Sequence, residues 1–238
     1  HAIERSTSKT PGLYAITTDD HGERSFTYWR DNSAAKDLFQ THQGFSFAVL
    51  SQFDVIFFSG ISLAILPATA RDAWLDWLAE HRQQVGKTIV FDSNYRPRLW
   101  GSEDEARHYM SRAWSVATIA LPSVDDEQLL HGDATDEDVI DRIRALGVPA
   151  GVLKRGAEGP VGFDSNALYE ATQTNTSALS VNVVDTTAAG DSFNGAYIAS
   201  LLMGESPQTA LVAAHQCAVK VIGFRGAIVP KESFKASP

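Results

Sequence analysis

The stretch Asp185-Thr-Thr-Ala-Ala-Gly-Asp-Ser-Phe-Asn-Gly-Ala-Tyr197 decides the fold of this chain. Val181-Asn-Val-Val184 precedes it and predicts a strand, while Phe193 to Met203, which is apolar at most positions and ends at Gly204, predicts a helix. A strand, a loop of small and polar residues and a helix N-terminus therefore follow one another. The first amides of such a helix point at one place and carry the positive end of the helix dipole, so the loop could bind an anion.

Asp191 lies in the first turn of this predicted helix, beside the expected anion site. A carboxylate next to a bound phosphoryl group is what phosphoryl transfer to a hydroxyl requires. Asp, Ser and Thr are also ordinary N-caps, and small residues are common in tight loops. An ordinary joint needs one cap and one glycine, whereas here all seven positions from 185 to 191 are polar or very small, which favours the functional interpretation.

The composition is typical of a globular protein with one large core. The chain has 238 residues, of which 44% are hydrophobic and 21% charged, and its net charge is −9. Such an acidic chain is a poor candidate for binding nucleic acid or an anionic membrane. Its single cysteine, Cys217, excludes an internal disulfide and suits a reducing cytoplasm, where we expect the protein to be. The most apolar stretch, 55–66, is too short to span a bilayer.

The N-terminal part of the chain predicts a β-hairpin. Two strand-like runs within residues 11–30 flank a short turn that ends at Gly22, which suits a left-handed position. In that register Tyr14 faces Tyr28, and Arg30 shares their side of the hairpin. This face could bind a ligand, or it could be an aromatic cross-strand pair with a solvated arginine. The pattern alone favours neither interpretation.

From residue 54 onward, strand-like and helix-like segments alternate. The expected strands are 54–58, 87–91, 117–121, 149–153, 161–163, 167–169 and 181–184, and the expected helices are 67–85, 103–116, 136–146, 190–203 and 207–222. Such alternation predicts right-handed βαβ units and a mostly parallel sheet with helices on both faces. Sites in these sheets lie at the carboxyl ends of the strands. Polar stretches follow the strands at 92–98, 122–127, 154–159 and 185–191, so we expect them to converge on one edge.

The first of these stretches holds two arginines on either side of Pro97. The guanidinium of Arg96 or Arg98 could bind a carboxylate or a phosphate through two parallel hydrogen bonds. The alternative is a structural arginine that pairs with Asp92. We favour a functional role for one of the two.

Two further stretches give weaker signals. Lys154-Arg-Gly-Ala-Glu-Gly159 could approach nucleotide phosphates, or it could be a simple turn between strands. The acids in Ser123-Val-Asp-Asp-Glu127 stand at a strand-to-helix junction, where the helix dipole alone favours them, but they could also hold Mg²⁺ through water. The chain has no G-x-x-x-x-G-K-[ST] motif and no H-R-D or D-F-G triplet, so a kinase of this sequence would belong to another class.

The stretch from Asp185 to Phe193 resembles the D-T-x-G-A-G-D-x-F signature of the ribokinase-like (PfkB-type) carbohydrate kinases. Further segments are similar to the branch of this family that acts on 2-keto-3-deoxygluconate, in the same order along the chain: Pro11-Gly-Leu-Tyr14, Gly22-Glu-Arg24, Tyr28-Trp-Arg30, Ser59-Gly-Ile-Ser-Leu-Ala-Ile-Leu66, Asn94-Tyr-Arg-Pro-Arg-Leu-Trp100, Val152-Leu-Lys-Arg-Gly-Ala157 and Arg225-Gly-Ala-Ile-Val-Pro230. The resemblance implies a three-layer α/β/α fold with a mostly parallel central sheet and a small β lid. Residues 1–30 would form part of the lid, and residues 31–238 the nucleotide- and sugar-binding core.

The resemblance also implies a reaction, namely phosphorylation of the 6-hydroxyl of this sugar acid by ATP with Mg²⁺. Asp191 would be the general base, and the amides of Ala188, Ala189 and Gly190 would form the anion hole. The sugar acid would contact Tyr14, Tyr28, Arg30 and Arg96. ATP would lie along Asn94, Lys154, Gly156, Ala157 and Gly159 and the loop 188–190. Mg²⁺ would be organised by Asp126 or Glu127 through water, and the enzyme is expected to be a homo-oligomer.

Three departures from the family pattern keep other interpretations open. Ala188 replaces the first glycine of the loop, so this position cannot rely on a backbone conformation that is restricted to glycine. Ser123-Val-Asp-Asp126 stands where the family has the magnesium motif N-x-x-E. The family's first strands and its Gly-Gly substrate loop, which precede the lid hairpin, have no match here. The alternatives are a fructokinase or ribokinase activity, or a non-catalytic sugar- or nucleotide-binding protein of this fold.

Overall fold

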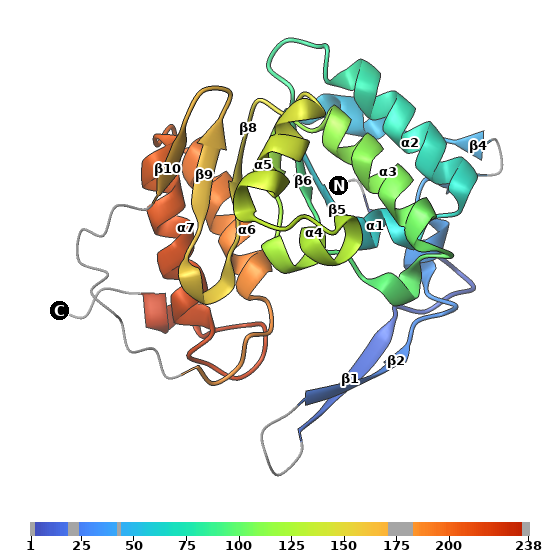
Figure 1. Cartoon of the computed structure of the whole chain (residues 1–238). Coiled ribbons are helices and arrows are strands. Elements are labelled where there is room, and N and C mark those ends of the chain that lie inside the picture. Colours follow the sequence, from blue (N-terminus) through green and yellow to red (C-terminus); the bar gives the residue numbers. More distant parts are fainter. Residues whose placement is uncertain (1–2, 19–23, 42–43, 171–182, 235–238) are drawn as a thin grey trace.

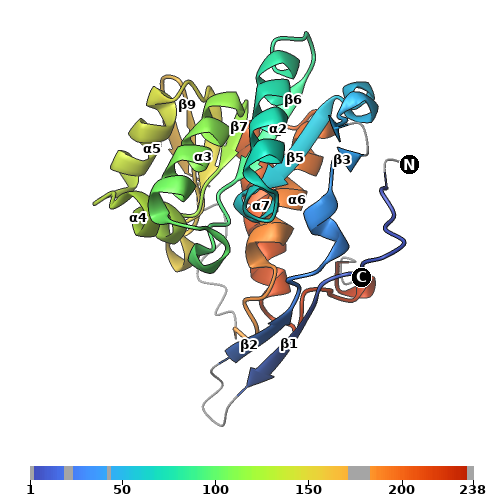
Figure 2. The same cartoon turned by 90° about the vertical axis from the view of Figure 1, so that its right-hand side faces the viewer.

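The computed structural model describes residues 3–18, 24–41, 44–170 and 183–234 (Figures 1 and 2). Its strands are β1 (Leu13–Thr18), β2 (Arg24–Trp29), β3 (Gln40–Thr41), β4 (Gly44–Phe45), β5 (Val55–Ser59), β6 (Thr88–Asp92), β7 (Ile119–Leu121), β8 (Ala150–Leu153), β9 (Val161–Asp164) and β10 (Leu168–Glu170). Its α-helices are α1 (Gly60–Ala64), α2 (Ala68–His81), α3 (Glu103–Val116), α4 (Val124–His131), α5 (Asp136–Ala145), α6 (Ala189–Leu202) and α7 (Pro207–Val221). Short 3₁₀ helices span Ala34–Asp37, Ala48–Gln52, Pro97–Leu99, Gly156–Glu158 and Lys231–Phe234.

The central sheet has six strands in the order β10-β9-β8-β7-β6-β5. The four strands from β5 to β8 run parallel, and β9 and β10 add an antiparallel edge. Helices cover both faces, with α2 to α5 on one side and α6 and α7 on the other (Figures 1 and 2). The predicted three-layer fold with a mostly parallel sheet is confirmed.

Successive side chains of the buried strands pack alternately into two separate hydrophobic cores. Ile89 and Phe91 of β6 point to the core under α1 to α5, while Val90 between them points to the core under α6 and α7. This alternation follows from the two-residue period of a strand, and it explains why strands that are covered on both faces are apolar throughout. The sheet is therefore a rigid platform, and its strand ends can hold side chains in fixed places.

The helix boundaries follow local capping signals. The Ser102 hydroxyl accepts a hydrogen bond from the amide of Glu105 at the start of α3, and Thr135 and Asp138 form a capping box at the start of α5. Ser206 caps α7, whose first residue is Pro207. Each arrangement satisfies amides that have no partner within the helix. The predicted starts of these helices are confirmed for this reason.

The hairpin of β1 and β2 projects from the body of the molecule (Figures 1 and 2). Both views place it at the end where the loop before α6 lies. Its antiparallel register pairs Tyr14 with Tyr28, as predicted. The turn that was expected to end at Gly22 lies outside the described residues.

Three expectations differ from the structure. A strand was expected at 181–184, but residues 183 and 184 belong to no strand. The amides of Val184 and Asp185 donate to the carbonyl of Ile222 instead of to a neighbouring strand. Residues 181–182 lie outside the described part. Helix α2 ends at His81 rather than near residue 85. The short helix α1, which follows β5 directly, was not predicted, because its residues continue the apolar run of the strand.

Candidate active site

The polar stretches at the carboxyl ends of the parallel strands converge as predicted. Ser123, after β7, forms a backbone bridge with Lys154, after β8. The ammonium of Lys154 lies 2.7 Å from the Asp92 carboxylate at the end of β6 and 3.2 Å from the Asn194 side-chain oxygen of α6. Three strand ends and the N-terminal half of α6 therefore meet at one place.

A pocket of about 210 Å³ opens at this place. It is lined by Ser123, Asp125, Lys154, Arg155, Gly156, Pro160, Ala189, Gly190, Phe193, His215 and Ala218. Charged and backbone polar groups lie at its strand ends, and side chains of α6 and α7, apolar except for His215, form its other wall. Such a mixture of a few polar groups with an apolar wall is usual for small-molecule sites.

The loop 185–188 is held in place by the Asp185 carboxylate. This side chain accepts hydrogen bonds from the amide of Thr187 at 2.8 Å and from the amide of Gly226 at 2.9 Å. The second bond ties the loop to the segment after α7. The loop that leads into α6 is therefore fixed from two sides.

Two of the three amides predicted to form an anion hole lack an acceptor among the described residues. The amide of Ala189 donates to the carbonyl of Thr186 at 3.2 Å, but the described hydrogen bonds leave the amides of Ala188 and Gly190 without a partner. Amides in the first turn of a helix have no intrahelical acceptor and can bind an anion. The structure thus places two donors beside the pocket wall that Ala189 and Gly190 form.

Ala188 has a left-handed backbone with φ 62° and ψ 17°. An L residue can adopt this conformation, at a cost of about 1–2 kcal/mol relative to the right-handed region. As expected, this position does not rely on a backbone conformation that is restricted to glycine, but the left-handed conformation is strained for alanine. Asp191 follows in the first turn of α6 with an exposed side chain.

The loop after β6 carries Asn94 and Arg96. Asn94 has a positive φ of 31°, and its buried side-chain oxygen has no hydrogen-bond partner among the described residues. The guanidinium of Arg96 donates to the carbonyl of Tyr95 at 2.7 Å and lies 3.5 Å from the Asp126 carboxylate. About half of the Arg96 side chain (51%) remains exposed, so it can still reach a ligand.

Asp126 binds this same loop. Its carboxylate accepts hydrogen bonds from the Ser93 hydroxyl at 3.3 Å and from the Tyr95 amide at 3.1 Å. Burial raises the pKa of Asp126, while Arg96 acts in the opposite direction. Asp126 therefore links α4 to the loop that holds Arg96.

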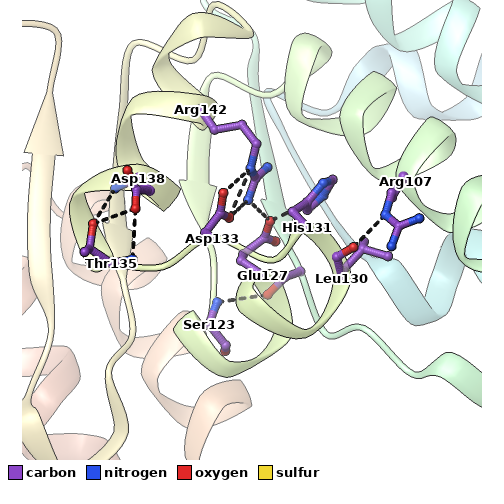
Figure 3. Close-up of polar contacts among 10 residues, drawn as sticks. Arg107, Ser123, Glu127, Leu130, His131, Asp133, Thr135, Asp138 and Arg142 are labelled. Carbon is purple, nitrogen blue, oxygen red and sulfur yellow. Dashed lines mark hydrogen bonds and ion pairs between the residues drawn. The ribbon is translucent and has the colours of Figure 1, made fainter.

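Glu127, the other acid considered for Mg²⁺, points into the interior between α4 and α5 (Figure 3). It is fully buried and lies 2.8 Å from Arg142, which also binds Asp133 at 2.5 Å. His131 is 3.8 Å away on the same helix. Burial raises the pKa of Glu127 to about 7 despite Arg142, and burial lowers the pKa of His131 to about 4. In this structure Glu127 holds α4 against α5, and its carboxylate is bound to Arg142.

The turn after β8 carries the remaining candidates for nucleotide contact. Gly156 and Gly159 both have a positive φ, of 55° and 80°, and Ala157 lies between them in a 3₁₀ turn. Arg155 is not a free cation: its guanidinium pairs with Asp136 and Glu170 and donates to the Gly159 carbonyl. Arg155 therefore shapes the turn, while Lys154 points toward α6.

The hairpin presents the expected face of two tyrosines and an arginine. The rings of Tyr14 and Tyr28 are 6.2 Å apart. The guanidinium of Arg30 lies 4.1 Å from the centre of the Tyr28 ring, within the range of a cation–π contact. The structure brings these three side chains together and keeps the tyrosines about half exposed.

Several pocket residues were missed by the sequence interpretation. His215 of α7 and Pro160 line the pocket, and Asp92 and Asn194 hold Lys154. A signal for Asn194 existed, because residues four apart share one face of a helix and Asn194 follows Gly190 by four. No comparable signal existed for His215, since its position depends on how α7 packs beside α6.

The described residues contain neither a metal-binding cluster nor a membrane-spanning helix. No cluster of three or more His, Cys, Asp or Glu side chains there could hold a metal ion. No helix in the described ranges has both the length and the apolar character needed to cross a membrane.

The sequence and the fold match known proteins. The family model of the pfkB family carbohydrate kinases matches residues 1–233. The 2-dehydro-3-deoxygluconokinase of Escherichia coli (strain K12) is 41% identical over 235 residues, which cover 98% of this chain and 75% of that protein. The protein of the same name from Dickeya dadantii (strain 3937) is 42% identical over 239 residues, with the same two coverages. The crystal structure of a putative ribokinase II from E. coli in complex with ATP and Mg²⁺ matches with a TM-score of 0.75 and 26% identity, over 92% of this chain and 67% of that one.

Proposed function

Because the chain belongs to the pfkB family of carbohydrate kinases, we propose that it transfers the γ-phosphoryl group of ATP to the 6-hydroxyl of 2-keto-3-deoxy-D-gluconate. This compound is the 2-dehydro-3-deoxygluconate of the relatives' name, and about two fifths of the aligned residues are shared with them. The product would be 2-keto-3-deoxy-6-phosphogluconate. We also propose that residues 1–30 act as part of a lid over the core and that the enzyme works in the cytoplasm as a homo-oligomer.

One observation carries this proposal, namely the juxtaposition of a carboxylate with open helix amides at a pocket wall. Asp191 stands in the first turn of α6, and the amides of Ala188 and Gly190 have no acceptor among the described residues. Phosphoryl transfer needs mainly positioning and electrostatic stabilisation, and this arrangement offers both.

In the proposed reaction the 6-hydroxyl oxygen attacks the γ-phosphorus in line with the leaving ADP. The new bond joins this oxygen to phosphorus, and the bond between phosphorus and the β–γ bridging oxygen breaks, with its electrons leaving on ADP. Asp191 accepts the hydroxyl proton. The amides of Ala188 and Gly190 donate to the oxygens of the transferred group, where negative charge is concentrated. The adenine would lie toward the apolar wall near His215 and Ala218.

The residues present also fit Mg²⁺ bound together with ATP. Such a magnesium ion takes most of its ligands from phosphates and water and needs one or two carboxylates. Asp125 lines the pocket and Asp126 is the next residue of α4, whereas Glu127 is bound to Arg142. Asp125 and Asp126 would hold the ion, and Glu127 would act by fixing α4. When bound, the ion supplies charge neutralisation of the phosphates.

Two arginines favour an acidic over a neutral sugar. Arg30 lies over the Tyr28 ring on the hairpin, and Arg96 stands half exposed after β6. A guanidinium binds a carboxylate through a planar pair of donors. A neutral sugar offers these cations no charge partner.

ADP release in a coupled assay with 2-keto-3-deoxygluconate, fructose and ribose tests the proposal. We expect the sugar acid to be used with the highest kcat/KM. Arg96→Met should lower that kcat/KM by about tenfold to a hundredfold, since hydrogen bonds to charged groups contribute about 1.5–3 kcal/mol, and should leave neutral sugars unaffected. Arg98→Met is the matched control, because Arg98 is exposed two residues further along the same loop.

Other outcomes of this assay would point elsewhere. Equal turnover of fructose or ribose would contradict the acid preference and favour a fructokinase or ribokinase activity. Binding of ATP or sugar by calorimetry without any ADP release would favour a non-catalytic binding protein. The kinase proposal fails if no sugar supports ADP release.

A further inference from the structure

A buried lysine lies behind the N-terminus of α6. The side chain of Lys154 is 11% exposed, and that of its partner Asp92 is 4% exposed. The third member of the group, Asn194, is 1% exposed. The ammonium donates to the Asp92 carboxylate at 2.7 Å and to the Asn194 oxygen at 3.2 Å. The group therefore joins the ends of β6 and β8 to the second turn of α6.

The ammonium is close to the expected phosphoryl position. A Cβ atom built on Gly190 would lie 3.9 Å from the Lys154 Nζ. Lys154, Ala189 and Gly190 also line the same pocket. An ammonium has three N–H donors, and the described acceptors take two of them. One donor is left for a group that enters the pocket.

The lysine stands beside the positive end of a helix, where a cation is unusual. Helix N-termini carry positive partial charge and favour acids, as the first turns of α3 and α5 show with three acids each. Lys154 instead adds a cation beside the first turn of α6. The Asp92 carboxylate offsets the positive charge of Lys154. This contact uses only one N–H donor of the ammonium, and Lys154 still lines the pocket. A structural salt bridge alone gives no reason for a cation to stand at this end of a helix.

Asn194 adds a second observation. Its side-chain nitrogen is buried and has no hydrogen-bond partner among the described residues, while its oxygen accepts from Lys154. A buried amide donor without an acceptor costs stability, so packing alone does not explain the residue. Its oxygen, together with Asp92, sets the direction in which the ammonium points.

We propose that Lys154 donates its remaining N–H to the phosphoryl group in transfer, and that Asp92 and Asn194 are positioning residues that aim it. This inference rests on the proposed kinase function. Lys154 acts as a fixed cation that complements the amides of Ala188 and Gly190, and no bond to it is made or broken in the reaction. Because the ammonium is held before the ligand arrives, it needs no reorganisation when charge builds up on the phosphoryl oxygens.

The test compares variants of Lys154 in the coupled ADP assay at saturating ATP. Lys154→Met should lower kcat by about a hundredfold to a thousandfold, the usual effect of removing one preorganised donor, with KM for the sugar within threefold of the wild type. Lys154→Arg should recover part of this loss, because it keeps the charge. Lys231→Met, at an exposed lysine far along the chain, is the control and should leave kcat unchanged.

A second measurement separates this role from a structural one. We expect Lys154→Met to weaken the binding of ADP with aluminium fluoride and sugar, which imitates the transferred phosphoryl, at least tenfold more than it weakens the binding of ADP alone. A merely structural lysine would change both equally. Asn194→Ala, which keeps the cation, should lower kcat about threefold to tenfold, and thus covers the case in which Lys154→Met does not fold.

The outcomes separate this inference from the kinase proposal. A wild-type protein that releases no ADP with any sugar would remove the kinase proposal. An active wild type with a folded Lys154→Met of unchanged kcat, or with an Asn194→Ala of unchanged kcat, would overturn the assignment of Lys154 and leave the kinase proposal standing.

Discussion

The two ends of the candidate site are built in different ways. At the α6 end, the functional groups are set by buried polar contacts between β6, β8 and α6, and Lys154 and Asn194 are almost fully buried. At the hairpin end, Tyr14 and Tyr28 are 50% and 43% exposed and are held by pairing between neighbouring strands. One end is part of the protein core, and the other stands out from it.

This difference indicates a division of labour. Catalysis by electrostatic stabilisation needs groups that do not move, and in the proposed function the core would supply them. In the proposed function, recognition by a lid needs groups that approach and leave with the ligand, and the projecting hairpin would supply these. Changes at the α6 end should therefore alter kcat or the free energy of unfolding, while changes in the hairpin should alter KM for the sugar.

The largest effect is expected for Asp191→Asn. Loss of a general base lowers kcat by about 10²–10⁴-fold, while ATP binding, measured by calorimetry, should stay within about twofold. Glu205→Gln, at another exposed acid, is the control and should not change kcat. A kcat within tenfold of the wild type would show that the α6 end does not supply the base.

The pair of Glu127 and His131 predicts opposite pH effects in the core. The pKa of Glu127 rises from 4.5 to about 7 on folding, so unfolding releases a proton over this window and stability falls as pH rises. The pKa of His131 falls from 6.5 to about 4, so unfolding binds a proton and stability rises with pH. The two slopes oppose each other between pH 4.5 and 6.5, and the wild type should show little change there.

Substituting one residue of this pair leaves the pH dependence of the free energy of unfolding that is due to the other. In His131→Asn the free energy of unfolding should fall as the pH rises from 5 to 7, because only Glu127 then contributes. In Glu127→Gln it should increase as the pH rises from 5 to 6.5, because only His131 contributes. Each change should be on the order of 2 kcal/mol, at about 1.4 kcal/mol per pKa unit. In Glu127→Gln, Arg142 keeps its contact with Asp133. Urea unfolding at these pH values measures the slopes. Parallel slopes in both variants would contradict the assigned shifts.

A smaller effect is expected in the hairpin. Tyr28→Leu removes the ring that Arg30 covers at 4.1 Å, and an exposed cation–π contact contributes about 0.5–1 kcal/mol. KM for the sugar acid should rise about twofold to fivefold, with kcat and the melting temperature unchanged. Tyr28→Phe keeps the ring and serves as the control. A fall in melting temperature with unchanged KM would mean that the hairpin stabilises the fold rather than binding the sugar.

The smallest effect is expected for Ala188→Gly. Glycine adopts a φ of 62° without the strain that alanine has at this position. Glycine also raises the conformational entropy of the unfolded chain, which lowers stability. The net gain should be about 0.5 kcal/mol, or 1–2 °C in melting temperature, with kcat equal or higher. Ala188→Val tests the opposite direction, because a β-branched residue is poorly tolerated at positive φ. A valine variant as stable and active as the wild type would argue against the left-handed conformation.

The sequence predicted local features well. Tyr14 and Tyr28 could be paired from the hairpin register, because only a few residues separate the two strands. The expected helices 103–116, 136–146 and 207–222 begin where α3, α5 and α7 begin, and each start is stabilised by a cap from a neighbouring residue. The meeting of the polar stretches after β6, β7 and β8 at one edge followed from the rule that parallel strands end on the same side of a sheet. The fourth stretch, 185–191, joins them through α6, because residues 183 and 184 belong to no strand.

Contacts between distant residues could not be predicted in this way. Lys154 is 62 residues from Asp92 and 40 from Asn194 along the chain. Their meeting depends on the strand order and on which face each side chain takes, and no local pattern encodes either. The strand expected to end at Val184 was wrong in its described residues for a related reason, because the amide of Val184 donates to the carbonyl of Ile222 after α7.

The sequence by itself determined the fold class, the hairpin register and the small-residue loop before α6, because each depends on local pattern and on general rules of chain topology. The tertiary structure decided which charges are available to a ligand. Arg155, from the stretch that could approach phosphates, and Glu127, a candidate for Mg²⁺, are bound in ion pairs, while Lys154 lines the pocket and contacts Asp92 and Asn194. Burial makes an unpaired charge costly, so packing determines which charged groups pair with each other and which face a ligand.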